Sequence, residues 1–102
     1  MANVFKNYTS ASVGTSAVTT YTVATGKTAV VIGCSLANRT ASQIKVDVQM
    51  AGVFLVKGVP VPANSALSVL DGKLILEADD TTVVTSDTGS SCDVILSVLE
   101  QS

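Results

Sequence analysis

The stretch Ile44–Gln49 reads IKVDVQ and alternates apolar and polar residues at every step. Successive side chains of a β-strand point to opposite faces of a sheet. The isoleucine and the two valines therefore share one face, while Lys45, Asp47 and Gln49 share the other. This pattern predicts a strand with one face in a core and the other in water.

Similar short apolar runs, bounded by Gly, Pro, Asn or Asp, recur along the chain, and no window shows a 3.6-residue period. Asp71-Gly72 predicts a tight hairpin between its flanking runs, because glycine accepts the positive φ of a type I′ turn. Two prolines within 58–64 lack ladder donors and predict a crossing loop. We expect strands at residues 17–23, 28–36, 44–49, 53–57, 66–70, 73–77, 81–85 and 92–99. The predicted fold is all-β: a single β-sandwich or jelly-roll-like domain of about eight short antiparallel strands, over residues 17–102.

Length and charge restrict the classes of partner. The chain has 102 residues, of which 47% are hydrophobic and 14% charged, a composition that suits one folded domain. Six Lys and Arg against eight Asp and Glu give a net charge of −2, with no basic excess to attract nucleic acid or an anionic membrane. The start does not resemble a secretory signal, and no apolar run approaches the ~20 residues that cross a bilayer. We expect neither nucleic acid nor membrane as a partner.

The residues needed for common catalytic chemistry are missing. The chain has no His, which removes the usual general base and imidazole metal ligand. A nucleophilic Ser would need Lys as its base, and no such pair stands out by spacing. Asp71, Asp79, Asp80 and Asp87 fall in turns, where Asp is common, and their spacing matches no known Ca²⁺ loop. We predict no enzymatic activity and no cofactor, hence no catalytic, cofactor-binding or metal-binding residues.

The two cysteines, Cys34 and Cys92, each fall inside an expected strand among aliphatic residues. Their separation does not match the close pairs of zinc or redox motifs. We predict two buried, unpaired thiols, with a disulfide between two strands as the alternative.

Residues 1–16 lack a strand pattern but contain Phe5 and Tyr8, half of the aromatic residues in the chain. We predict an extended N-terminal arm that anchors the domain to an adjacent subunit. The alternative is that the segment folds back as an extra edge strand of its own sandwich. In the last expected strand, Ile95 and Leu99 point outward if Cys92 points inward. The candidate interface residues are therefore Phe5, Tyr8, Ile95 and Leu99, and we expect a homo-oligomer.

Several segments resemble one known family in their order along the chain. They include ANVFKN at residues 2–7, GKTAVVIG at 26–33, SLANRT at 35–40, LVKGVPVP at 55–62 and KLILE at 73–77. Their joint order is similar to that of short virion structural proteins from tailed bacteriophages, especially those infecting cyanobacteria and other aquatic bacteria.

The resemblance implies a non-enzymatic virion structural protein, assembled in the host cytoplasm, and above all a capsid decoration or cement protein. The implied partners are other virion proteins: the major capsid protein, or tail and neck proteins. A first alternative is a neck, tail or baseplate accessory module. A second alternative, from a different class, is a carbohydrate-binding β-sandwich, which usually stacks a sugar ring on an exposed Trp or Tyr. This chain has no Trp.

Overall fold

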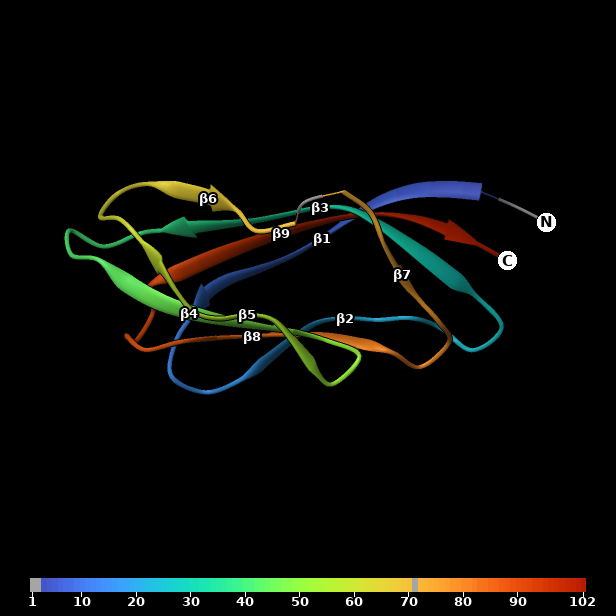
Figure 1. Ribbon diagram of the computed structural model, residues 1–102, viewed down its shortest axis with the longest axis horizontal. Helices are drawn as coiled ribbons and strands as arrows, with labels where there is room; N and C mark the ends of the chain where they lie inside the picture. The colour runs from blue at the N-terminus through green and yellow to red at the C-terminus, as the bar shows by residue number, and fades with distance from the viewer. Residues whose placement is uncertain (1–2, 71) are drawn as a thin grey trace.

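The computed structural model describes residues 3–70 and 72–102, and two antiparallel sheets packed against each other form its architecture (Figure 1). The first sheet has the strand order β1-β9-β3-β6, with β7 also paired to β3, and the second has the order β2-β8-β4-β5. The predicted all-β sandwich is confirmed. The strands are β1 (Asn3–Val13), β2 (Val18–Thr22), β3 (Thr28–Asn38), β4 (Ile44–Met50), β5 (Val53–Val61), β6 (Ala66–Ser68), β7 (Leu74–Leu76), β8 (Thr81–Ser86) and β9 (Cys92–Gln101).

The strand order is that of a jelly roll. β6 pairs with Ser35–Ala37 of β3 and β7 pairs with Ala29–Val31, so the two short strands are successive parts of one interrupted sheet edge. If β6 and β7 are counted as one strand, each sheet has four strands. The chain then passes repeatedly from one sheet to the other, as it does in double-sheet jelly rolls.

The predicted hairpin around Asp71-Gly72 is wrong, because β6 and β7 pair with β3 and not with each other. Gly72 has a φ of 86°, whereas Asp71 lies outside the described residues. Between the two short strands, the Val69 N–H donates to the Cys34 carbonyl at 3.0 Å. Pairing along β3 buries Leu76 completely. Burial of this kind outweighs the local turn preference of Asp-Gly.

The crossing loop predicted at residues 58–64 is also shorter than expected, since β5 continues to Val61. Pro60 lies opposite Lys45 of β4. A proline is tolerated here because β5 is an edge strand, which pairs on one side only. The crossing between sheets is made by residues 62–65.

Strand β1 occupies most of the segment that we expected to be an arm, residues 1–16. It pairs antiparallel with β9, from Asn3 opposite Gln101 to Ser10 opposite Val94. Of the two arrangements expected for this segment, the single chain adopts the edge strand. The physical reason is that Tyr8 finds a partly buried, hydrogen-bonded position within its own sandwich. Met1 and Ala2 lie outside the described residues.

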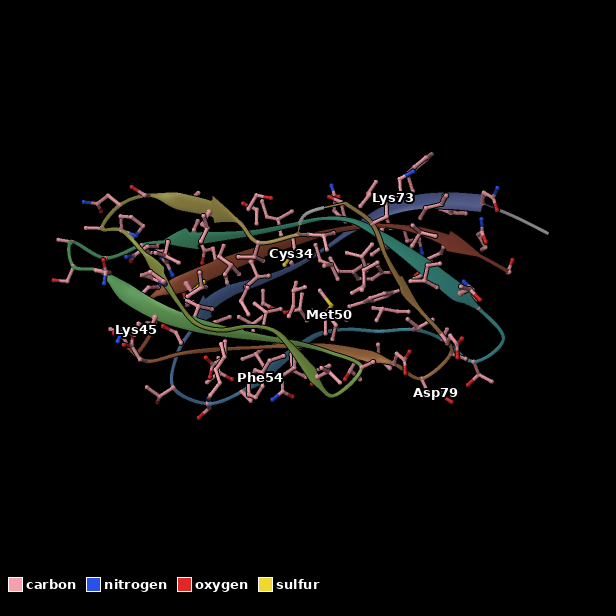
Figure 2. All side chains as sticks on the ribbon, in the orientation of Figure 1. Cys34, Lys45, Met50, Phe54, Lys73 and Asp79 are labelled. Atoms are coloured by element: carbon pink, nitrogen blue, oxygen red, sulfur yellow. The ribbon has the colours of Figure 1, made fainter. Side chains whose placement is uncertain are left out.

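The core between the sheets is mostly valine and leucine, and it also holds both cysteines as free thiols, as predicted. Figure 2 shows Cys34 and Met50 between the two sheets. Cys34 lies opposite Leu96, and Cys92 lies opposite Asn38. The two cysteines are thus four residues apart along β9, or about 13 Å, too far for a disulfide without backbone movement. Within residues 3–70 and 72–102 no helix could cross a membrane.

Candidate interaction surface

An apolar row crosses the outer face of the first sheet. Phe5 of β1 lies opposite Leu99 of β9, Leu99 lies opposite Val30 of β3, and Val30 lies opposite Ile75 of β7. At the two ends of this row, Phe5 is 73% exposed and Ile75 is 65% exposed. Neighbouring strands are about 4.8 Å apart, so the row spans about 14 Å. We call these four residues the Phe5 row.

The sheet surface on both sides of the Phe5 row is uncharged. On one side, the next outward-facing row consists of Asn3, Gln101 and Thr28. On the other side, the next row consists of Asn7, Ser97 and Gly33. The row after that consists of Thr9, Ile95, Ser35 and Ser68. Further along β9, Asp93 is the first charged residue on this face, with its carboxylate 3.7 Å from Arg39. Lys73 and Glu77 flank β7 at the sheet edge and are exposed. A centre depleted of charged residues within a polar rim is the usual composition of a protein interface.

The second sheet differs in this respect. Its strands β4 and β5 carry Lys45, Asp47 and Lys57 at exposed or half-buried positions. The Lys57 ammonium lies 4.7 Å from the ring centroid of Phe54, which gives this exposed aromatic ring a polar neighbour. The solvent-facing side predicted for Ile44–Gln49 is confirmed, since its isoleucine and valines are fully buried and its polar residues point outward.

The structure brings together two of the four predicted interface residues. Phe5 and Leu99 are direct cross-strand neighbours in the Phe5 row. Ile95 points to the same face and is 50% exposed, but it lies four residues along β9, about 13 Å away. Tyr8 points to the opposite side of β1, between the sheets.

Val30 and Ile75 were not predicted, because the register that aligns them with Phe5 and Leu99 depends on strand order. A weak signal was present in the segment Leu74–Leu76, whose three consecutive apolar residues cannot all face inward in a strand. In the structure Leu76 is buried, and Ile75 is exposed.

A buried carboxylate lies on the inner side of the same sheet. The hydroxyls of Tyr8 and Tyr21 each donate to Oε2 of Glu100 at 2.7 Å, and their rings are stacked with centroids 4.2 Å apart. The ammonium groups of Lys6 and Lys27 lie 3.7 and 3.9 Å from Oε1 of the same carboxylate. We call these five residues the Glu100 cluster.

The cluster holds Glu100 in its ionised form. Hydrogen bonds from Tyr21 and Tyr8, aided by the charges of Lys6 and Lys27, lower the pKa of Glu100 although burial opposes them. Burial and the bond to Glu100 raise the pKa of Tyr8 to about 12 and also raise that of Tyr21. The carboxylate thus accepts two hydrogen bonds at Oε2 and forms two ion pairs through Oε1. The Glu100 cluster therefore connects β1, β2 and β9 and thereby joins the two sheets.

Three of the acidic residues in turns, Asp79, Asp80 and Asp87, accept hydrogen bonds from other groups of the chain. Asp80 accepts a hydrogen bond from the Glu77 N–H at 2.9 Å, and Asp87 accepts one from the Lys45 N–H at 3.1 Å. Asp79 accepts a longer bond from the Thr25 hydroxyl. Across residues 3–70 and 72–102, no group of three or more acidic, His or Cys side chains is placed to hold a metal ion, and no pocket is found.

No family model matches this chain, and no curated protein matches it. The Phe5 row and the uncharged face around it are therefore the features on which a function can be argued.

Proposed function

We propose that this protein is a non-enzymatic structural protein of a tailed-bacteriophage virion, specifically a capsid decoration or cement protein bound to the major capsid protein. The order of its sequence segments supports this proposal. Jelly rolls occur in viral capsid proteins, but also in lectins and cupins, so the fold is compatible with the proposal without deciding it. The observation that carries the proposal is the Phe5 row on an uncharged sheet face.

The Phe5 row has the properties of a contact that is repeated many times. Burying one large apolar side chain contributes about 1.5 to 3 kcal/mol. Phe5 and Ile75 are both largely exposed, so covering them would give a modest affinity for each copy. Copies that also contact one another on a repeating lattice gain avidity without any new kind of contact. A small domain with one apolar face suits such a lattice.

The position in the virion is tested by imaging. Particles of the phage that encodes the chain are purified, the chain is identified in them by mass spectrometry, and an antibody-labelled sample is imaged by cryo-electron microscopy. Label over the head supports the decoration role. Label on the neck, tail or baseplate replaces it with the accessory role. Absence of the chain from purified particles overturns the virion proposal.

The role of the Phe5 row is tested with a matched pair of substitutions. Ile75 in the first sheet is 65% exposed, and Val53 in the second is 68% exposed. Both Ile75→Thr and Val53→Thr should leave the urea midpoint of unfolding almost unchanged, because neither side chain lies in the core. Ile75→Thr should lower occupancy on particles several-fold and Val53→Thr should not. Equal loss of occupancy for the two variants would rule out the Phe5 row as the contact.

The carbohydrate-binding alternative has less structural support. Carbohydrate-binding β-sandwiches usually stack a sugar ring on an exposed Trp or Tyr. Tyr21 is buried, and the hydroxyls of both tyrosines are bound to Glu100. Glycan binding that is lost on Phe54→Ser or Phe5→Ser would favour this alternative over the virion role.

A further inference from the structure

The two sheets present four edges, formed by β1, by β6 with β7, by β2 and by β5. An edge strand exposes unpaired N–H and C=O groups to which another strand can bind. Proteins commonly protect such edges with short strands, prolines, bulges or charged residues. The four edges of this protein differ sharply in how well they are protected.

Three of the edges have protecting features. β5 contains Lys57, Pro60 and Gly58, whose φ is 63°, and its pairing with β4 shifts register twice. β6 and β7 have three residues each. β2 has five residues and a register shift in its pairing with β8. None of these edges offers a long regular strand.

Strand β1 is the least protected of the four edges. It has 11 residues and contains no proline, and its pairing with β9 is regular from Asn3 to Ser10. Its one register shift, between Ser10 and Val13, lies at the end of the strand, where Ser12 has a φ of 57°. Its one charged residue, Lys6, points to the inner side, where its ammonium lies 3.7 Å from Glu100. Among the described residues, β1 pairs with β9 and with no other strand, so the far edge of β1 carries no partner.

We propose that this free edge of β1 pairs with β1 of a second copy, antiparallel about a two-fold axis, and so joins the two first sheets into one continuous sheet. A two-fold interface brings the same surface together twice, so the strand must be compatible with itself. Asn3, Phe5, Asn7 and Thr9, which point to the outer face, are all uncharged. No antiparallel register therefore places like charges opposite each other on that face.

The strand is long enough for such an interface. Eight residues, Asn3–Ser10, extend over about 27 Å, and antiparallel pairing forms about one hydrogen bond per residue pair. The resulting number, about eight, falls within the range of about 10 ± 5 direct hydrogen bonds that typical interfaces contain. Pairing also makes the uncharged faces of the two copies continuous, Phe5 included. The inference goes beyond the proposed function and holds for the purified protein alone.

A first experiment compares two lysine substitutions. Thr9 is exposed on the edge strand β1, and Thr19 is exposed on the edge strand β2 of the other sheet. In a β1 pair, Thr9→Lys adds a positive charge to each copy on the joined and otherwise uncharged outer face, and repulsion between these like charges opposes association. Sedimentation equilibrium over a micromolar concentration series should show a dimer for wild type and Thr19→Lys, and a dissociation constant about tenfold or more larger for Thr9→Lys.

A second experiment identifies the geometry of pairing. Single cysteines replace Asn3, Phe5, Asn7 and Thr9 in turn, and intermolecular disulfides are measured after mild oxidation, with wild type as background because Cys34 and Cys92 are buried. Directly opposite side chains have Cβ atoms about 4.5 to 5.5 Å apart. A two-fold antiparallel pair should therefore cross-link strongly near its axis and weakly elsewhere. A monomer at every concentration, equal dissociation of the two lysine variants, or uniform cross-linking along β1 overturns the proposal.

Discussion

Tyr8 and Tyr21 stack on each other although they belong to different sheets, and their hydroxyls donate to the same oxygen of Glu100. At this end of the sandwich the contact between sheets is therefore aromatic and hydrogen-bonded. Elsewhere buried aliphatic residues, above all valines and leucines, make up most of the contact. The stability and pH dependence of the fold should reflect this difference.

Removing either tyrosine hydroxyl should destabilise the protein, and Tyr21→Phe should cost more than Tyr8→Phe. A hydrogen bond to a charged group contributes about 1.5 to 3 kcal/mol. Tyr21 is buried, whereas water can reach the position of the partly exposed Tyr8 and replace its hydroxyl. Urea unfolding of both variants and of the double variant measures these costs. Because the two hydroxyls share one acceptor, the double variant should deviate from additivity, and strict additivity would contradict the shared site.

Acidification should remove the contribution of Glu100. Its pKa is lowered in the folded chain, so the unfolded chain binds a proton first as the pH falls. The stabilisation is therefore complete above the unfolded pKa of about 4.3 and is lost as the pH falls through the folded value. Glu100→Gln should be less stable than wild type by about 1.5 to 3 kcal/mol at neutral pH. Asp87, whose pKa is also lowered, titrates in both proteins and cancels in the comparison.

The measurement for this prediction is the urea midpoint of wild type and Glu100→Gln between about pH 3 and about pH 7. The two curves should converge as the pH falls. A difference that stays constant over this interval would show that the charge of Glu100 is not what stabilises the cluster.

At alkaline pH the dependence of stability on pH runs in the opposite direction, because stability falls as the pH rises. The pKa of Tyr8 is raised from 10.0 to about 12, so the unfolded chain loses this proton first. The stabilisation is present below pH 10 and declines as the pH rises toward about 12. Tyr8→Phe should lose less stability than wild type over this interval, as measured by denaturant unfolding. Parallel declines would mean that Tyr8 ionises with an ordinary pKa.

The two thiols should be unreactive in the folded protein. Burial raises the pKa of both Cys34 and Cys92 to about 11, and the thiolate is the reactive form. A colourimetric thiol titration of protein prepared without reductant should detect almost no rapid reaction in buffer and two thiols in denaturant. Rapid native labelling of either cysteine would contradict its position in the core.

Most strands were predictable because their apolar residues alternate or form short runs. β1 was not, since its inner face carries Lys6 and Tyr8, which contact the buried carboxylate of Glu100, and Ser10, which bonds to the Thr20 hydroxyl. A strand whose inner face packs against a polar cluster has no alternation of apolar and polar residues to detect. The pairing of β6 and β7 with β3 was missed because the Asp-Gly turn signal is local, whereas the choice of partner strand depends on the whole sheet.

The candidate surface was also predictable only in part, because the period of a strand is local and the alignment of strands is not. Exposure of Leu99 and Ile95 followed from the period of one strand. The alignment of Leu99 with Phe5, Val30 and Ile75 follows from three pairings between segments far apart in the sequence. The Glu100 cluster likewise joins residues 92 and 79 positions apart, as the Tyr8 and Tyr21 bonds show.

The position of β9 between β1 and β3 has a consequence for biosynthesis. Of the strands in the described residues, β9 is the last to leave the ribosome, yet it is the strand with which β1 pairs. β1 therefore has no sheet partner from its own chain until nearly all of this sequence has been translated, and its pairing must close loops of almost the full length. Folds dominated by such distant pairings form slowly. Until β9 arrives, the unpaired β1 is exposed to other nascent chains on the same polysome.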